Sequence, residues 1–311
     1  MFLSTLNQIG YLFLLIALGF IIMKACKMPS DATKTLSKLE SFIFMPALII
    51  SNFAANFTTK RLGSLWQYFV LGVVVIVISI ALAYLIAHFT AKDDYHRRIH
   101  IYSLAFSNFG FMGTAVVSAV YPELFTEYLV FASALWIFNY GWAIPTLLIP
   151  KEDKTKGIKA TLKNFLNPMF IAMFIGIMIG LIGIKLPTFI SASVGALSDC
   201  MSPVAMLITG MTVATIDLKK TLKSKSIYIL TVISVILVPL AFIGISMLTP
   251  LDYSLELIAL CALSMPLGLN SVVIPAAYGK DTSDAAGMAI VSHLLSALTI
   301  PLMLVIFTNL Q

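Results

Sequence analysis

The residues whose types and spacing could do chemistry stand in the middle of an apolar segment near the C-terminus. Residues 264–275 read Ser-Met-Pro-Leu-Gly-Leu-Asn-Ser-Val-Val-Ile-Pro. The proline at 266 removes a backbone donor and clashes with the preceding turn, so a helix through this segment must kink or break. Inside hydrocarbon, freed backbone groups are tolerated only where they are buried in protein or line a wet cavity. The segment predicts either a proline-kinked packing helix or a binding site, and the candidate site residues are Pro266, Asn270 and Ser271.

The composition of the chain indicates a helical protein that crosses a membrane several times. Of the 311 residues, 59% are hydrophobic and 11% are charged, whereas soluble domains contain about 25% charged residues. The net charge of +6 needs no nucleic-acid partner, because membrane topology accounts for it. Three scattered cysteines without a CxxC pair predict neither a disulfide framework nor a metal site. The first apolar run lacks a basic leader, so we expect a retained helix rather than a signal peptide.

Membrane-spanning helices need about 20 apolar residues each, and the apolar runs predict ten such spans. They cover residues 6–25, 39–57, 66–89, 100–120, 126–149, 165–183, 198–216, 226–249, 257–279 and 285–309. The fold class expected from this pattern is an all-α polytopic membrane protein.

Lysine and arginine residues are distributed unevenly between the two sides of this array. Seventeen of the 20 Lys and Arg residues fall on the side of the odd-numbered loops. The other side carries only Lys60, Arg61 and Lys185. Because cytoplasmic loops hold the excess of positive charge, the odd-numbered loops are predicted to be cytoplasmic. Both termini are then extracellular, and the chain is expected in the cell membrane.

Like residues recur at nearly one offset along the chain. The pairs are Pro46 with Pro203 and Ser107 with Ser264, each 157 residues apart, and Pro145 with Pro301, 156 residues apart. This offset divides the ten spans into two sets of five, residues 1–155 and 156–311. Five is an odd number, so the two repeats must be inverted relative to each other. Inverted repeats with discontinuous helices are a transporter architecture.

The fourth span has an interruption at the repeat position that matches the C-terminal break. Residues 103–114 read Ser-Leu-Ala-Phe-Ser-Asn-Phe-Gly-Phe-Met-Gly-Thr. Two glycines weaken the helix here, and Ser107, Asn108 and Gly110 are the candidate site residues. The span lacks a proline beside Asn108, so the two halves of the predicted site are not equivalent.

Taken together, these residues resemble the auxin efflux carrier family, whose bacterial members include malate and malonate permeases. The resemblance rests on the Ser-Asn-Phe-Gly-Phe-Met-Gly segment, the Asn and Pro break of the ninth span, Phe-Met-Pro at 44–46 and Ile-Thr-Gly-Met at 208–211. It implies the fold of bile-acid symporters and sodium/proton antiporters, in which the fourth and ninth helices unwind and cross. Spans 1, 2, 6 and 7 would form a scaffold, and spans 3–5 and 8–10 a mobile transport domain. It also implies that Asn108 and Asn270 contact a substrate carboxylate, and that the protein is a homodimer.

The chemistry expected at the crossing is reversible binding of a small organic anion. Helix N-termini carry roughly half a positive charge and several unpaired amides, and the segments after the breaks begin near Gly110 and Asn270. The alternative is that the asparagines only satisfy the broken backbone. Asn139 and Tyr140 in the fifth span form a second polar pair that lines the site or packs between helices.

Coupling to an ion is open at the level of sequence. Asp199 lies four residues before Pro203, where it acts as an N-terminal cap or carries a proton. His293 in the last span suits a proton relay or a structural hydrogen bond. Sodium bound by backbone carbonyls is a further possibility, and no cofactor or metal is expected.

The sequence analysis therefore predicts a secondary transporter of small organic anions with an elevator-type mechanism. Its partners are the substrate and membrane lipid. The alternative is an anion channel or passive uniporter pore. We find no paired-Asp, His-Glu-x-x-His or Gly-x-Ser-x-Gly motif, so an enzyme is not expected.

Overall fold

The computed structural model describes residues 2–29, 31–149, 168–215, 224–249, 251–278 and 280–311. Throughout these ranges the regular secondary structure is helical, and one isolated β-bridge joins Ser107 to Leu267. Six helical runs are long and apolar enough to cross a membrane, and four further apolar helices are shorter. The predicted all-helical membrane protein is thereby confirmed at the level of class.

The N-terminal half consists of helices that follow the predicted spans closely, with π-helical segments inside several of them. They are α1 (Phe2–Ala25), the continuous run α2 (Asp31–Leu39), η1 (Glu40–Phe44) and α3 (Met45–Asn56), then α4 (Thr59–Thr90), α5 (Asp94–Ala105), η2 (Phe109–Gly113), α6 (Thr114–Val120), η3 (Pro122–Leu124), α7 (Phe125–Phe138) and η4 (Asn139–Leu148). The charged connection predicted at 151–164 lies outside the described residues.

The helices of the C-terminal half follow in a similar order. In each half, the span before the last one is interrupted. The C-terminal helices are α9 (Pro168–Ile182), α10 (Thr188–Asp199), α11 (Met201–Ala214), α13 (Lys225–Val232), η6 (Ile233–Leu237), α14 (Val238–Ser246), α15 (Tyr253–Leu263), α16 (Asn270–Ala277) and α17 (Ser283–Leu310).

The largest departure from the predicted spans concerns Asp199. The span expected at 198–216 begins ten residues earlier, at Thr188, directly after Pro187. Asp199 is the last residue of α10 and is exposed, and α11 starts without a side-chain cap. The prediction that Asp199 caps this helix is therefore wrong. The serines of α10 lowered its apparent hydropathy, so the sequence placed the start of the helix too late.

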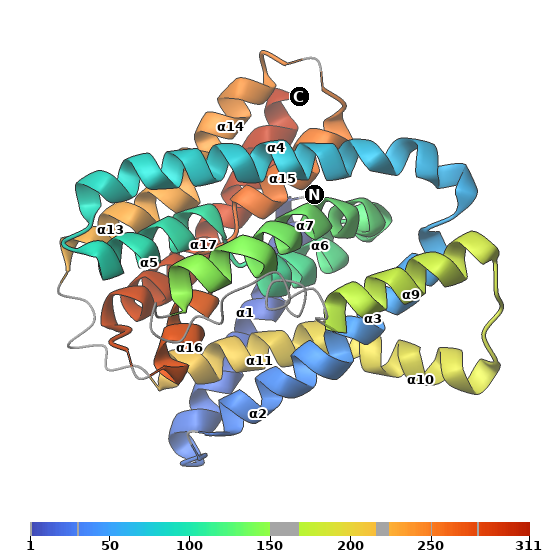
Figure 1. Cartoon of the computed structure of the whole chain (residues 1–311), viewed down its shortest axis with the longest axis horizontal. Coiled ribbons are helices and arrows are strands. Elements are labelled where there is room, and N and C mark those ends of the chain that lie inside the picture. Colours follow the sequence, from blue (N-terminus) through green and yellow to red (C-terminus); the bar gives the residue numbers. More distant parts are fainter. Residues whose placement is uncertain (1, 30, 150–167, 216–223, 250, 279) are drawn as a thin grey trace.

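The helices form two groups in space. Figure 1 shows α1, α2, α3, α9, α10 and α11 together in the lower and right part of the molecule, and α4, α5, α7 and α13 to α17 in the upper and left part. In the first group α1 packs on α11 and α3 packs on α9 and α10. In the second group α4 packs on α5 and α7, and α13 packs on α17.

Glycines let the backbones of the first group touch. A Cβ added at Gly19 of α1 would collide with the carbonyl oxygen of Leu207 in α11. A Cβ added at Gly176 of α9 would lie 3.2 Å from the Cα atom of Ile50 in α3. Small residues at helix contacts are typical of membrane proteins. Lipid tails are as apolar as the side chains, so the hydrophobic effect does not drive helices together there, and close van der Waals packing stabilises the contact instead.

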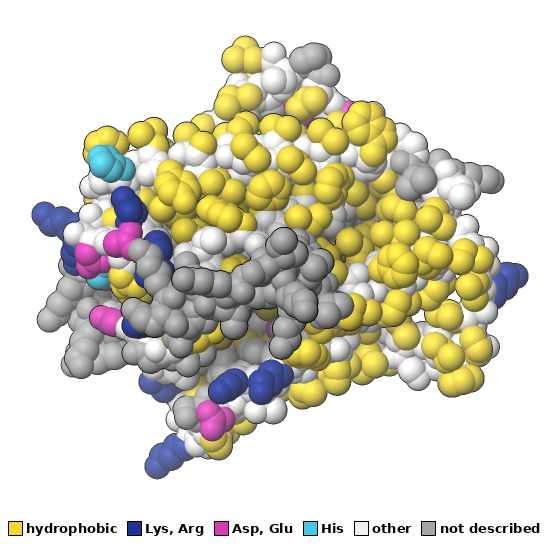
Figure 2. Space-filling model, in the orientation of Figure 1, with side chains coloured by type: hydrophobic (Ala, Val, Ile, Leu, Met, Phe, Trp, Pro, Cys, Tyr) yellow, Lys and Arg dark blue, Asp and Glu magenta, His cyan; other side chains and the backbone are white. Residues whose placement is uncertain are grey.

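Apolar side chains dominate the visible surface. Figure 2 shows them covering α4 and the right-hand helices, while most of the charged side chains on this face gather at the left and lower edges. A wide apolar belt bounded by charge is the surface expected of a protein surrounded by lipid.

Candidate functional site

Two interrupted helices meet at the centre of the structure. The first interruption separates α5, which ends at Ala105, from η2, which begins at Phe109. The second separates α15, which ends at Leu263, from α16, which begins at Asn270. The second interruption is the longer of the two. It contains Pro266, which prevents a regular helix there, whereas the first interruption has no proline. The helix start predicted at Asn270 is where the structure has it, and the one predicted near Gly110 is one residue earlier.

The two interruptions bind each other through backbone and side-chain hydrogen bonds. The amide of Asn108 donates to the carbonyl oxygen of Pro266 at 2.7 Å, next to the bridge between Ser107 and Leu267. The hydroxyl of Ser107 donates to the carbonyl oxygen of Ala262 at 2.8 Å. Groups freed by each break are thus partly satisfied by the other, which is how a broken helix is stable away from water.

A small cavity opens where the breaks meet. It is lined by Met45, Tyr102, Ser107, Asn108, Phe109, Gly110, Phe111, Trp136, Asn139, Tyr140, Met169, Gly268, Leu269 and Asn270. None of these residues is charged, and the free volume is about 30 Å³. Water fits in such a space, whereas ligand pockets are usually roughly 300–1,000 Å³. The cavity as it stands is therefore too small for a small organic molecule.

The structure brings six of the eight residues predicted for the substrate site to this cavity: Ser107, Asn108, Gly110, Asn139, Tyr140 and Asn270. The remaining two, Pro266 and Ser271, are buried beside it without lining it. Pro266 offers its carbonyl oxygen to Asn108, and the hydroxyl of Ser271 donates to the carbonyl oxygen of Gly268 at 2.8 Å. Their positions indicate that they shape the break.

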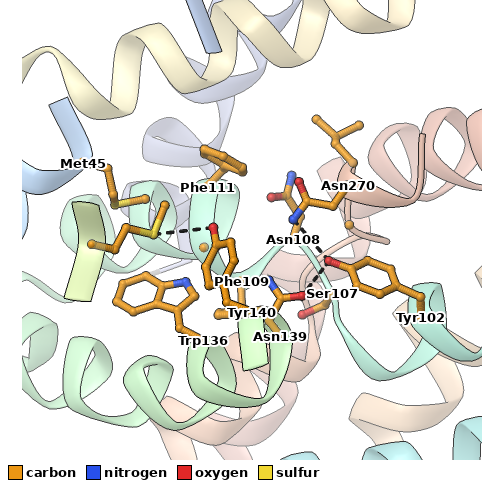
Figure 3. Close-up of a pocket in the computed structure, with 14 residues that line it drawn as sticks. Met45, Tyr102, Ser107, Asn108, Phe109, Phe111, Trp136, Asn139, Tyr140 and Asn270 are labelled. Atoms are coloured by element: carbon orange, nitrogen blue, oxygen red, sulfur yellow. Dashed lines mark hydrogen bonds between the residues drawn. The ribbon is translucent and has the colours of Figure 1, made fainter. Parts of the chain in front are cut away.

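A chain of hydrogen bonds connects the second break with α5 and η4. Asn270 Nδ2 donates to the hydroxyl of Tyr102 at 3.2 Å, and that hydroxyl donates to Asn139 Oδ1 at 2.8 Å (Figure 3). Tyr140 stands on the other side of the cavity, where its hydroxyl donates to the sulfur of Met169 at 3.7 Å. Sequence reasoning missed Tyr102. Its signal was a hydroxyl-bearing aromatic residue on an apolar helix, in the same span as Asn108.

His293 reaches the first break from α17. Its Nδ1 lies 2.7 Å from the carbonyl oxygen of Ala289, and its Nε2 lies 3.2 Å from Asn108 Nδ2. A carbonyl oxygen only accepts, so the proton of the neutral ring is on Nδ1 and Nε2 accepts from the Asn108 amide. Asn108 Oδ1 accepts from the amide of Met112 at 3.4 Å. The histidine predicted as a relay or a structural group thus orients a predicted site residue.

The helix starts supply positive potential to the cavity. The first amides of a helix have no acceptor within the helix, and the structure partners several of them from the breaks. In α16 the amides of Val272 and Val273 donate to the carbonyl oxygen of Leu269, and in η2 the Met112 amide donates to Asn108 Oδ1. Side-chain amides of Asn108, Asn139 and Asn270 lie at the same place. The lining of the cavity thus combines side-chain amides and helix dipoles with no charged side chain.

Asp93, His96 and Asp284 form a cluster of ionisable groups at the starts of α5 and α17. Asp93 caps α5 by accepting from the His96 amide at 2.9 Å, and that hydrogen bond lowers the pKa of the Asp93 carboxyl. The His96 ring lies 2.8 Å from Asp93 Oδ2 and 3.7 Å from Asp284 Oδ2. Asp199, the other predicted coupling residue, is not among the residues lining the cavity.

A search of curated proteins finds no match to the chain. A family model described as membrane transport protein matches residues 5–304. This match spans both interrupted segments and every predicted site residue. The chain therefore belongs to this family of membrane transport proteins, the auxin efflux carrier family, as the motifs of the fourth and ninth spans predicted.

Proposed function

We propose that the protein is a secondary transporter of small organic anions, carboxylates such as malate or malonate or auxin-like aromatic acids. The observation that carries this proposal is the meeting of two broken helices, with Asn108 and Asn270, in a cavity without charged side chains. Helix N-termini and amide groups bind a carboxylate there and release it again. A buried lysine would hold the anion more tightly and slow its release.

The packing supports two inverted repeats of five spans. Gly19 contacts Leu207, and the residues displaced by 157 positions from these two are Gly176 and Ile50, which also contact each other. The pairing of α1 with α11 is matched in the same way by α9 with α3, and that of α4 with α7 by α13 with α17. A repeated set of contacts at the sequence offset is what two copies of one fold produce.

The two spatial groups of helices support an elevator-type mechanism. We assign α1, α2, α3, α9, α10 and α11 to a scaffold, and α4 to α7 with α13 to α17 to a transport domain that carries both breaks. The cavity lies at their boundary, since Met45 and Met169 reach it from the scaffold. Movement of the transport domain would expose the site to each side in turn.

The alternative is an anion channel or a passive uniporter pore. The cavity of about 30 Å³ is not an open pore, so a channel would also need a rearrangement to conduct, and only kinetics separates the two. Saturable uptake with counterflow of labelled substrate would support the carrier. Currents that rise linearly with concentration would support the channel.

We propose a location in the cell membrane with cytoplasmic odd-numbered loops, extracellular termini and a homodimeric assembly. Cys26 is exposed after α1, on the proposed cytoplasmic side. With Cys200→Ala and Cys261→Ala in place, a membrane-impermeant maleimide should label Cys26 only after cells are permeabilised. A Lys185→Cys variant that also carries Cys26→Ala should be labelled in intact cells. The reverse pattern would invert the topology.

Asn270→Ala is the substitution that tests the site from the second break. It removes the donor to Tyr102, which also holds Asn139. Loss of one hydrogen bond to a charged ligand costs about 1.5–3 kcal/mol, so uptake at low substrate concentration should fall roughly 10- to 100-fold. Uptake is measured in proteoliposomes with a panel of mono- and dicarboxylates. Proton, sodium and voltage gradients are imposed in turn.

The same panel identifies the coupling ion, because only the gradient that drives transport will accelerate wild-type uptake.

Asn56→Ala is the matched control for Asn270→Ala. This asparagine lies at the end of α3 with its side chain bonded to the carbonyl oxygen of Asn52, outside the cavity. Equal uptake by Asn270→Ala and Asn56→Ala would remove Asn270 from the site.

A further inference from the structure

A second cavity lies at the crossing, where the first halves of the two broken helices end. Its free volume is about 20 Å³, which is room for one particle about as large as a water molecule. It is lined by Val75, Ile76, Ser79, Leu104, Ala105, Ser107, Leu135, Ser234, Val238, Ala262 and Leu263. These residues come from α4, α5, α7, η6, α14 and α15 and from the first break, in the upper and left part of the molecule in Figure 1.

Two helix C-termini meet at this second cavity. Leu104 and Ala105 are the last two residues of α5, and Ala262 and Leu263 are the last two of α15. The last carbonyl groups of a helix have no amide partner within it, and a helix C-terminus carries roughly half a negative charge. The first cavity lies at two helix starts, so the second cavity has the opposite polarity. Carbonyl oxygens at such half-helix ends are suited to binding a cation inside a membrane.

Three serine hydroxyls add further oxygen atoms to the lining. Ser234, on the π-helical segment η6, is only 6% exposed, and its hydroxyl has no hydrogen-bond partner among the residues that the structure describes. The hydroxyl of Ser107 donates its proton to the carbonyl oxygen of Ala262, so its lone pairs remain available. Ser79 contributes the third hydroxyl from α4. A buried hydroxyl without a partner is costly, and its place beside two helix C-termini indicates a ligand there.

We propose that this second cavity binds one Na⁺ ion, held by the hydroxyl oxygens of Ser79, Ser107 and Ser234 and by carbonyl oxygens at the ends of α5 and α15. The lining contains no acidic side chain, so Ca²⁺ or Mg²⁺ would lack the carboxylates that these ions usually take. It also contains no side chain that titrates near neutral pH, so it cannot carry a proton. A water molecule is the competing occupant, because it fits the same space without the charge.

Ser107 connects the proposed Na⁺ site with the substrate cavity. It lines both cavities, and the next residue, Asn108, is a proposed substrate ligand. An ion bound to Ser107 would fix the backbone of the first break and place a positive charge close to the anion. The two ligands should therefore bind cooperatively, each raising the affinity of the other by the same factor. This coupling rests on the proposed function, whereas binding of Na⁺ itself does not.

Thermal unfolding of the full-length protein in detergent, without substrate, tests the binding. Sodium chloride replaces choline chloride at constant ionic strength, and potassium chloride is titrated in a parallel series. An ion that binds only the folded protein stabilises it, so the melting temperature should rise saturably with Na⁺, by roughly 2–5 °C. No rise with Na⁺, as expected if the cavity holds only water, or an equal rise with K⁺, would overturn the assignment to sodium.

Ser234→Ala assigns the effect to this cavity. It removes one oxygen ligand, and the apparent Kd for Na⁺ should rise at least about tenfold, while the melting temperature in choline chloride reports whether the variant folds. Ser246→Ala is the matched control. This serine is also buried in the same helical run, but its hydroxyl donates to the carbonyl oxygen of Ile243 at 2.8 Å, outside the cavity. An unchanged Kd in Ser234→Ala would overturn the site.

Uptake in proteoliposomes separates the ion site from its role in transport. An inward Na⁺ gradient should accelerate carboxylate uptake by the wild type and by Ser246→Ala, and Ser234→Ala should need about tenfold more Na⁺ for the same effect. Equal uptake in sodium and choline, by a protein whose melting temperature rises with Na⁺, would overturn the coupling and leave the ion site. Absence of carboxylate uptake under every gradient would overturn the proposed function instead, because the thermal shift is measured without substrate.

Discussion

Gly268→Ala is expected to abolish transport by forcing the two helix breaks apart. Gly268 belongs to the second break and lines the cavity. A Cβ added there would lie 2.7 Å from the carbonyl oxygen of Phe106 and 3.4 Å from that of Ser107. Both are backbone atoms of the first break, so no side-chain rotation relieves the contact. The two breaks must move apart, and the bond between Asn108 and Pro266 is lost with them.

Uptake in proteoliposomes and thermal unfolding in detergent measure the effect together. Overpacking at a closed contact costs about 1–3 kcal/mol, so the melting temperature should fall, and transport should fall at least about 100-fold because the site itself is displaced. Gly244→Ala is the control, since a Cβ there meets nothing within 4 Å and alanine favours the helix. Native transport by Gly268→Ala would show that the contact between the breaks is not needed.

The second break was accessible to sequence reasoning because its cause is local. Pro266 forbids a regular helix, and α15 ends three residues before it, at Leu263. The position of α16 followed from the same argument. Elements that depend on proline, apolar length and loop charge were therefore predictable from the residues themselves.

The first break was located less accurately, because its cause is a partner far away in the sequence. The segment after the first break was predicted to begin near Gly110, whereas it begins at Phe109. The backbone there is held by Ser107 pairing with Leu267 and by Asn108 bonding to Pro266. Such pairing over more than 150 residues has no signal in a single sequence. Tyr102 was missed for the same reason, since its two asparagine partners are distant in the chain.

The interpretation of Asp199 failed for a different reason. Hydropathy alone separated the polar start of a long helix from its apolar end, and the acid was placed at the boundary. The helical run actually continues from Thr188 to Ala214. A spanning segment whose first half contains several serines is harder to recognise by hydropathy than one that is apolar throughout.

Asn108 is the residue at which substitution should most directly remove substrate recognition. Its backbone amide is used by Pro266, its Oδ1 accepts from Met112, and one Nδ2 hydrogen is directed to His293 Nε2. The side-chain amide has a second hydrogen, and Asn108 lines the cavity. That hydrogen is the donor that we expect a carboxylate to accept.

Asn108→Ala and Asn108→Asp together separate recognition from folding. Asn108→Ala removes the donor, and uptake should fall about 100-fold, as for the loss of a charged hydrogen bond. Asn108→Asp keeps the size but replaces the donor by an acceptor that repels both the anion and His293 Nε2, so uptake should be undetectable at neutral pH. Asn56→Ala again serves as the control for asparagine loss outside the cavity. Uptake of any carboxylate by Asn108→Asp at the wild-type rate would contradict an anion site here, because a second negative charge in so small a space cannot favour binding.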